Sequence, residues 1–504
     1  MKKIVVLAIA IVLATTAFTA LAAETTFNGE YRVRAWNEYN FDKKVEDISA
    51  PFILPGHENA QYDGWFDQRF RLTITHTRSE FLKAVIKFDL VEDTWGQQRN
   101  LLINNSAAGN FIDWAYIEFT LPTLGTFTVG KFPMQFGYGL MLSIGQDETP
   151  GIEGIKWSNA WGPVALSAYY LKGTDNITSG SGNPWYNWDT DIYAMDVKIT
   201  PMEDHLIELF GGVMFDNNAD TNAPFSGILW NSTTYWWNGD GEYSAVVGFW
   251  GLAYTGNIAD MIDIKLENSW LYGHATYISS FPTDGPGAFA DPDSFTIYGW
   301  NVYADVSYYN DLFRLGLAFL MGSGQHHYWN DISLTNVNIN YLMGDGFKWA
   351  NILGSWGGLN SVYNGAMGVG WPTAENLTSV KLYFEICPVE KLSLNLAVVW
   401  AKWTEDVGEN FAGTRAALVT AKGPGYPHPA SLYGNYWYQS WDAGDDLGWE
   451  LDFGFSYEIM EGLTYSLSAG VLFTGDSWDY EKADGTRGDW GEIWSITNQL
   501  LYEF

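Results

Sequence analysis

Charged side chains recur at short, even spacings in several segments of this chain. Six basic residues stand in three successive segments near the N-terminus, and five acidic residues stand further along. The basic residues are Arg32, Arg34, Arg69, Arg71, Lys83 and Lys87, and the acidic residues are Asp263, Glu267, Asp305, Glu450 and Asp452. An even spacing places side chains on one face of a β-strand. Rows of charge of both signs can sort charged solutes, so the chemistry that they predict is electrostatic recognition.

Groups suited to catalysis or metal binding are scarce. The seven His residues fall mostly in expected turns and loops, and no Ser–His–acid order stands out. The single Cys, Cys387, excludes a disulfide framework and a thiolate-rich metal site. Asp216, Asn218 and Asp220 offer oxygen ligands for Ca²⁺, but the later Gly and Glu of a calcium loop are missing. We therefore expect no enzyme activity, no metal and no cofactor.

The composition excludes several classes of protein. The 504 residues include 26 Lys and Arg against 59 Asp and Glu, which gives a net charge of −33. Such a chain would repel nucleic acid. An aromatic content of 17% is too high for a disordered protein. Beyond the N-terminus there is no apolar run of roughly 18 residues, so a bundle of membrane helices is not expected.

The first 22 residues have the pattern of a signal peptide. Lys2 and Lys3 precede an apolar stretch over 4–13, and Ala20-Leu21-Ala22 resembles a cleavage site. The apolar stretch is too short to span a bilayer as a helix. We therefore expect residues 1–22 to be removed on export and residues 23–504 to form a single domain.

Alternation of apolar and polar residues dominates the mature chain. In 261–273, Ile264, Leu266 and Trp270 share one face, and Lys265 and Glu267 share the other. This period of two predicts β-strands. We expect eighteen of them, over 26–39, 65–77, 81–92, 111–121, 126–137, 154–159, 163–172, 190–199, 206–215, 243–256, 261–273, 295–309, 312–322, 377–387, 391–403, 447–459, 463–474 and 492–504.

The expected connections alternate strictly between short and long. Short turns such as 310–311 are followed by long segments such as 323–376. This order is typical of a transmembrane antiparallel up-and-down β-barrel with short periplasmic turns and long extracellular loops. About eight strands already fill a barrel interior with side chains. Eighteen would therefore leave a wide lumen, so the apolar face is expected to contact lipid and the polar face to line water.

The last predicted strand has the most specific pattern. Leu500, Tyr502 and Phe504 share one face and end in a terminal Phe. This resembles the C-terminal signal by which the insertion machinery recognises outer-membrane barrels. Aromatic residues near strand ends are expected to form girdles at the membrane interfaces. They are Trp36, Trp65, Trp270, Tyr272, Trp400, Trp403 and Trp494.

Several motifs resemble those of the alginate-export family of bacterial outer-membrane channels. They are Ala115-Tyr116-Ile117-Glu118, Val129-Gly130-Lys131-Phe132-Pro133, Phe136-Gly137-Tyr138-Gly139, Gly154-Ile155-Lys156-Trp157 and the segment 448–457. The resemblance implies an eighteen-stranded barrel in a Gram-negative outer membrane and passive passage through a pore. An alginate exporter is expected to line its pore densely with Arg and Lys, whereas this chain is strongly acidic. The resemblance therefore does not extend to alginate as the solute.

These observations together predict a porin-like channel for small hydrophilic or charged solutes, with anions and saccharides among the candidates. The six basic residues would form one wall of the lumen and the five acidic residues would lie elsewhere on it. Glutamate at positions 69 and 71 should then shift selectivity toward cations. The segment 323–376 is a second candidate for the constriction. Expected partners are outer-membrane lipid, lipopolysaccharide and the insertion machinery, and the sequence leaves open whether copies form a homo-oligomer. The alternative is a plugged barrel that holds a periplasmic or surface partner, such as an electron-transfer protein.

Overall fold

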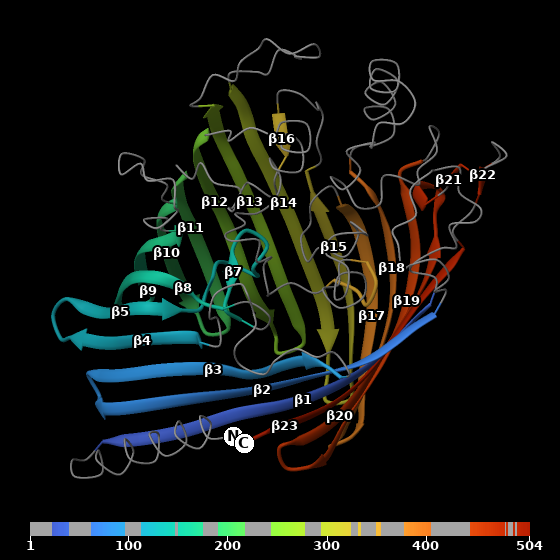
Figure 1. The fold of residues 1–504 in the computed structure, drawn as a ribbon, viewed down its shortest axis with the longest axis horizontal. Helices are drawn as coiled ribbons and strands as arrows, with labels where there is room; N and C mark the ends of the chain where they lie inside the picture. Colours follow the sequence, from blue (N-terminus) through green and yellow to red (C-terminus); the bar gives the residue numbers. More distant parts are fainter. Residues whose placement is uncertain are drawn as a thin grey trace.

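The computed structural model is a closed antiparallel barrel (Figure 1). It describes residues 23–39, 62–95, 112–146, 150–174, 190–216, 243–277, 294–323, 331–333, 349–353, 377–404, 444–478, 480–481, 487–488 and 491–504. The predicted signal peptide, 1–22, lies outside these ranges, as do the residues of the weak calcium pattern beyond Asp216. Among the described residues no helix has the length and apolar character needed to cross a membrane.

Eighteen strands make the barrel, as the alternation predicts. They are β1 (Glu24–Tyr39), β2 (Tyr62–Ser79), β3 (Leu82–Thr94), β4 (Ile112–Leu121), β5 (Gly125–Phe132), β8 (Ile152–Trp161), β9 (Val164–Thr174), β10 (Thr190–Met202), β11 (His205–Asp216), β12 (Tyr243–Ile258), β13 (Ile262–Tyr277), β14 (Ser294–Tyr309), β15 (Phe313–Gly322), β17 (Leu377–Val389), β18 (Leu392–Trp403), β19 (Asp446–Met460), β20 (Leu463–Thr474) and β23 (Glu492–Glu503). Each pairs antiparallel with the next strand in this order, and β23 pairs with β1 to close the sheet.

The remaining elements are short. The hairpin β6 (Met134–Gln135) and β7 (Ser143–Ile144) follows β5. Strand β16 (Asp331–Ser333) pairs parallel with β14, and β21 (Tyr480–Glu481) pairs with β22 (Arg487–Gly488) after the 3-10 helix η4 (Asp476–Trp478). The β6–β7 hairpin lies inside the ring of strands (Figure 1).

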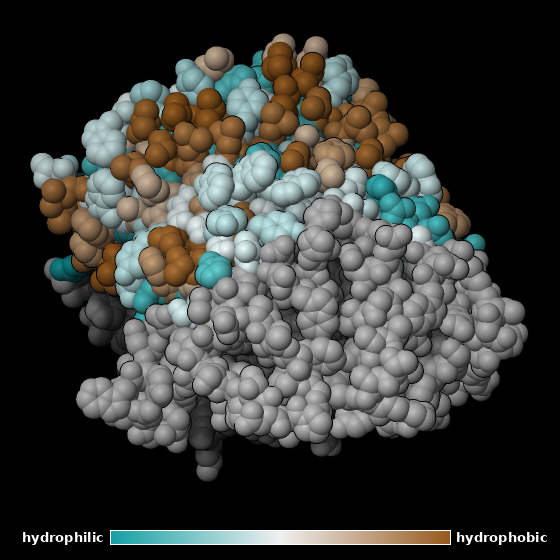
Figure 2. Space-filling view, turned by 90° about the horizontal axis from the view of Figure 1, so that it is seen from above, coloured by the Kyte–Doolittle hydropathy of each residue, from teal (hydrophilic) through white to brown (hydrophobic). Residues whose placement is uncertain are grey.

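The apolar face of the strands points outward. On β13, Leu266, Trp270 and Tyr272 are 41%, 43% and 61% exposed, whereas the intervening Glu267 and Ser269 are buried on the lumen side. Figure 2 shows apolar side chains over much of the described surface of the barrel, interspersed with weakly hydrophilic ones and a few strongly hydrophilic ones. An outward apolar band is the arrangement that contact with lipid requires.

The short connections are tight because their residues tolerate a positive φ. Gly125, Gly162 and Gly462 have φ values of 96°, 58° and 76°, and Asp204 and Asp260 also lie in the left-handed region. Glycine has no Cβ penalty there, and Asp carries a small one. The strands therefore end at the short turns that the sequence predicts.

The interface aromatics divide between the two faces of the barrel. Trp270, Tyr272 and Trp494 are exposed on the outer face, and Trp400 shares that face with the exposed Trp449. Trp36, Trp65 and Trp403 were predicted wrongly as girdle residues, because they share the parity of the lumen positions. Trp36 and Trp403 are each only 7% exposed, and Trp65 stacks on Trp36 with ring centroids 5.8 Å apart.

The closing seam leaves no space for a side chain at Gly29. A Cβ there would lie 2.4 Å from Cζ of Phe504 and 2.8 Å from the backbone oxygen of Arg71. We expect Gly29→Val to lower the unfolding free energy by roughly 1–3 kcal/mol, as overpacking does elsewhere. Gly248, whose Cβ would meet nothing closer than 3.7 Å, provides the matched Gly248→Val control. Urea unfolding in lipid vesicles would measure both, and equal losses would contradict the prediction.

Candidate functional site

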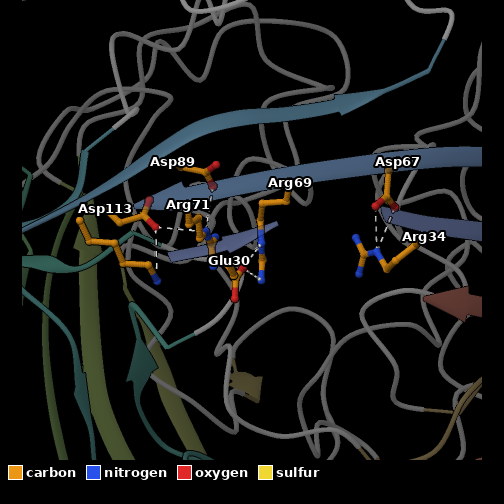
Figure 3. A network of polar contacts seen from close by, with 8 residues as sticks. Glu30, Arg34, Asp67, Arg69, Arg71, Asp89 and Asp113 are labelled. Atoms are coloured by element: carbon orange, nitrogen blue, oxygen red, sulfur yellow. Dashed lines mark hydrogen bonds and ion pairs between the residues drawn. The ribbon is translucent and has the colours of Figure 1, made fainter. Parts of the chain in front are cut away.

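The lumen wall of β1–β4 carries the predicted basic residues, and these form a network of ion pairs. At least five of the six have a carboxylate partner within 4 Å. Figure 3 shows the pairs of Arg34, Arg69 and Arg71. The pairs are Arg34–Asp67 at 2.9 Å, Arg69–Glu30 at 2.7 Å, Arg71–Asp89 at 3.1 Å, Lys83–Glu118 at 2.8 Å and Lys87–Asp113 at 3.5 Å. Arg32 lies on the same face and is buried. The wall is therefore of mixed charge rather than basic.

The alternation of β4 does not predict the lumen position of Asp113. The register between β3 and β4 shifts beside Lys87 and Phe88, which is a β-bulge. The bulge lets neighbouring residues point the same way. Trp114 therefore lies under Lys87 Nζ, 4.4 Å from the ring centroid, while Asp113 is 3.3 Å from Arg71. No residue type in this segment signals the bulge.

The depth of the ion pairs decides which of them a solute could reach. The side chains of Arg69 and Arg71 are only 3% and 4% exposed. Those of Lys83 and Glu118 are 38% and 31% exposed. Lys83 therefore offers a more accessible charge than the Arg69 and Arg71 pair, for which the sequence predicts the strongest effect on selectivity.

The segment after β5 turns into the lumen. The sequence predicts a strand over 126–137 and an external loop over 138–153, but β5 ends at Phe132. Pro133 has no N–H to donate to a sheet, which ends the pairing there. Residues 133–146, here called the first inward segment, pack their buried apolar side chains on the lumen faces of β8–β14. The contacts on the segment are Met134, Phe136, Met141, Leu142 and Ile144.

Glu267 on β13 accepts a hydrogen bond from the first inward segment. Its Oε2 accepts from the backbone N–H of Tyr138 at 2.6 Å, and the carboxylate is 1% exposed. Gly137 has φ 52°, and a Cβ on it would lie 2.5 Å from Glu267 Oε2. Only glycine fits this close approach at that φ. The Tyr138 hydroxyl reaches Thr255 Oγ1 at 2.5 Å, and burial raises the pKa of this phenol to about 12.

Part of the predicted constriction segment 323–376 also lies against the lumen wall. Residues 349–353, the second inward segment, pack on β14–β23 through Trp349, Ile352 and Leu353. Glu450 on β19 accepts from the backbone N–H groups of Ile352 and Leu353 at 2.7 and 2.8 Å. Lys381 Nζ donates to the Trp349 carbonyl at 2.6 Å. Most of the rest of 323–376 lies outside the described residues.

The other predicted acidic residues also have partners in the wall. Asp263 pairs with Arg314 at 2.9 Å, and Asp305 accepts from the Tyr383 hydroxyl at 2.8 Å. Asp452 is 8% exposed. The lumen face is not polar throughout. Its apolar side chains on β8–β14 are covered by the first inward segment, and those on β14–β23 are covered by the second. The charged wall of β1–β4 is the remaining arc.

The described residues contain no group of three or more His, Cys, Asp and Glu side chains arranged to hold a metal ion.

At the C-terminus, Leu500, Tyr502 and Phe504 are exposed on the outer face, and Phe504 exchanges backbone hydrogen bonds with Gly29 at 2.9 and 3.0 Å. The face predicted for these three residues is confirmed, and their role as an insertion signal stays a prediction.

Comparison with known proteins gives structural matches alone. No family model and no curated protein matches the chain. Among solved structures, OpdQ of Pseudomonas aeruginosa matches at 12% identity and a TM-score of 0.47, over 95% of this chain and 97% of that one. OccK2 (OpdF) of the same organism, in complex with glucuronate, matches at 11% and 0.46 over 96% of each chain. Similarity at this level bears on neither solute nor mechanism, so the fold rests on the strand pairing of this chain.

Proposed function

We propose that this protein is an outer-membrane channel for passive passage of small hydrophilic solutes. The observation that carries the proposal is a closed eighteen-stranded barrel with apolar residues outside and ion pairs inside. Lipid contact outside and charged side chains inside suit a wall between hydrocarbon and water. The proposal includes removal of residues 1–22, recognition of Leu500, Tyr502 and Phe504 by the insertion machinery, and contact with lipid and lipopolysaccharide. Membership of the alginate-export family remains part of it.

Conductance in a planar lipid bilayer tests the proposal. Purified protein should give discrete steps of current in simple salt, since each barrel that inserts into the bilayer would open one conducting path. Persistent absence of current from correctly folded protein would contradict it. The mixed charge of β1–β4 supports weak preference between anions and cations rather than a strongly anion-selective pore.

Charge reversal at Lys83 should shift this preference. Lys83→Glu places two carboxylates, its own and that of Glu118, at an accessible point of the lumen, so cations should be favoured. The reversal potential in a salt gradient should move in the cation-selective direction. Lys402→Glu is the matched control, because Lys402 lies on the outer face of β18 beside Asp445. An equal shift in both variants would exclude Lys83 from the ion path.

A second function is favoured by the two inward segments, which occupy much of the described lumen wall. A barrel filled in this way could hold a periplasmic or surface partner, such as an electron-transfer protein, instead of conducting. Purification from outer membranes distinguishes the two functions. A stoichiometric partner without conductance would favour the scaffold, and conductance without a partner would favour the channel.

A further inference from the structure

The two inward segments are attached to the barrel by the same device. In each case a buried carboxylate of the wall accepts from main-chain N–H groups of the segment. Glu267 accepts from Tyr138, and Glu450 accepts from Ile352 and Leu353. Loss of such a hydrogen bond would leave a buried backbone N–H without an acceptor, which is unfavourable, so these contacts fix the position of each segment.

The segments also meet each other. Leu140 of the first segment packs in the apolar cluster that holds Ile352 and Leu353 of the second. The Tyr303 ring on β14 lies between them. Its centroid is 5.4 Å from that of Tyr138 and 6.5 Å from that of Trp349, both edge to face. Such aromatic pairs contribute beyond the burial of area. Two segments about 200 positions apart in sequence are thus in one packed unit.

We infer that the two inward segments form one constriction unit, which Glu267 and Glu450 position and which Tyr303 couples. The word constriction rests on the proposed channel function, but the test below measures labelling and does not require that the protein conducts ions. Glu267 and Glu450 are then positioning residues that set the width of the lumen through the segments. The sequence predicts only that both residues line the pore.

The two carboxylates differ in what an isosteric change would do. Glu450 uses both oxygens, so Glu450→Gln places an amide N–H₂ against one of the two backbone donors. Glu267 uses one oxygen for Tyr138, so Glu267→Gln keeps an acceptor there, whereas Glu267→Ala removes it. We therefore expect Glu450→Gln and Glu267→Ala to displace their inward segments more than Glu267→Gln does. A simple effect of lost charge would make the two Gln variants equal.

Cysteine labelling tests the positioning and the coupling. The exposed Cys387 is first replaced by Ser. Met141→Cys then reports on the first segment and Ile352→Cys on the second, since both native side chains are 0% exposed. The probe is a water-soluble maleimide applied to protein in lipid vesicles. Leaving a buried backbone N–H without its acceptor should raise the labelling rate roughly tenfold to a hundredfold.

Coupling predicts that each anchor protects both segments. Glu450→Gln should expose Met141→Cys in the first segment, and Glu267→Ala should expose Ile352→Cys in the second, as reciprocal linkage requires. Tyr303→Ala should remove these cross effects and keep the direct ones. Glu385→Gln is the control, because Glu385 is a half-exposed lumen acid that lies 3.9 Å from Arg314 and contacts neither inward segment through its ion pair.

The outcomes separate the inference from the proposed function. Unchanged labelling in Glu450→Gln and Glu267→Ala, or equal labelling in Glu385→Gln, would overturn the positioning role. If each variant raised labelling only in the segment that its own glutamate holds, and not in the other segment, the two segments would not form a single unit. A protein that shows the expected labelling but conducts no current would contradict the channel and leave the constriction unit supported as part of a plugged barrel.

Discussion

Arg71→Met should destabilise the barrel by about 3–5 kcal/mol, the usual cost of removing one partner from a buried ion pair. Arg71 lies between the carboxylates of Asp89 and Asp113, at 3.1 and 3.3 Å, and these side chains are 9% and 5% exposed. Without the guanidinium, two acidic groups would remain buried close together. The loss of unfolding free energy can be measured by urea unfolding in lipid vesicles, with the folded fraction determined from the gel mobility of unboiled protein.

Arg34→Met is the matched control for Arg71→Met. Arg34 and Asp67 are 17% and 16% exposed, so water can solvate the carboxylate that remains. The loss should be nearer that of a partly exposed pair, about 1 kcal/mol. Asp89→Asn and Asp113→Asn, added to Arg71→Met, should restore part of the stability. Equal losses at positions 34 and 71 would show that burial does not determine the strength of this network.

Phe136→Ala should release the first inward segment and increase single-channel conductance. Phe136 is completely buried, stacked on Phe210 at 5.2 Å and in contact with the rings of Phe249 and Tyr169. Replacing such a residue by Ala costs about 3–5 kcal/mol. The barrel strands do not depend on this contact for their hydrogen bonds, so the cost should appear as local opening of the segment.

The control for Phe136→Ala is Phe473→Ala, at a side chain that is 43% exposed on the outer face. It should leave conductance unchanged. For Phe136→Ala, current noise should also rise as the segment moves. An unchanged conductance together with a lower unfolding midpoint would show that the segment stabilises the barrel and does not narrow the lumen.

The sequence predicts the barrel well because lipid outside and water inside impose one strict alternation. All eighteen expected strands are confirmed, with ends within five residues, and the largest difference is at the end of β5. Alternation also predicts the lumen face of Arg69, Arg71 and Lys87. The girdle prediction is wrong at Trp36, because Trp36 is an even number of positions from Arg32 and Arg34 and therefore shares their lumen face.

The interior of the barrel was less predictable than its wall. Pro133 signals the end of β5, but nothing in the period of two predicts that the following residues turn inward. The bulge at Asp113 depends on pairing with β3, which a single segment does not reveal. The partners of Glu267 and Glu450 are main-chain groups distant in sequence, so their side chains appear from sequence alone to be free for solutes.

Attachment through main-chain N–H groups makes little demand on the identity of the attached residues. Every residue except proline offers the same donor. Variants of Tyr138 that keep the backbone in place can therefore alter the bore while Glu267 still holds the loop. In such a barrel the backbone of a segment is held in place whichever side chains the segment carries. Randomising a few side chains of the segment could therefore yield channels with new permeation properties.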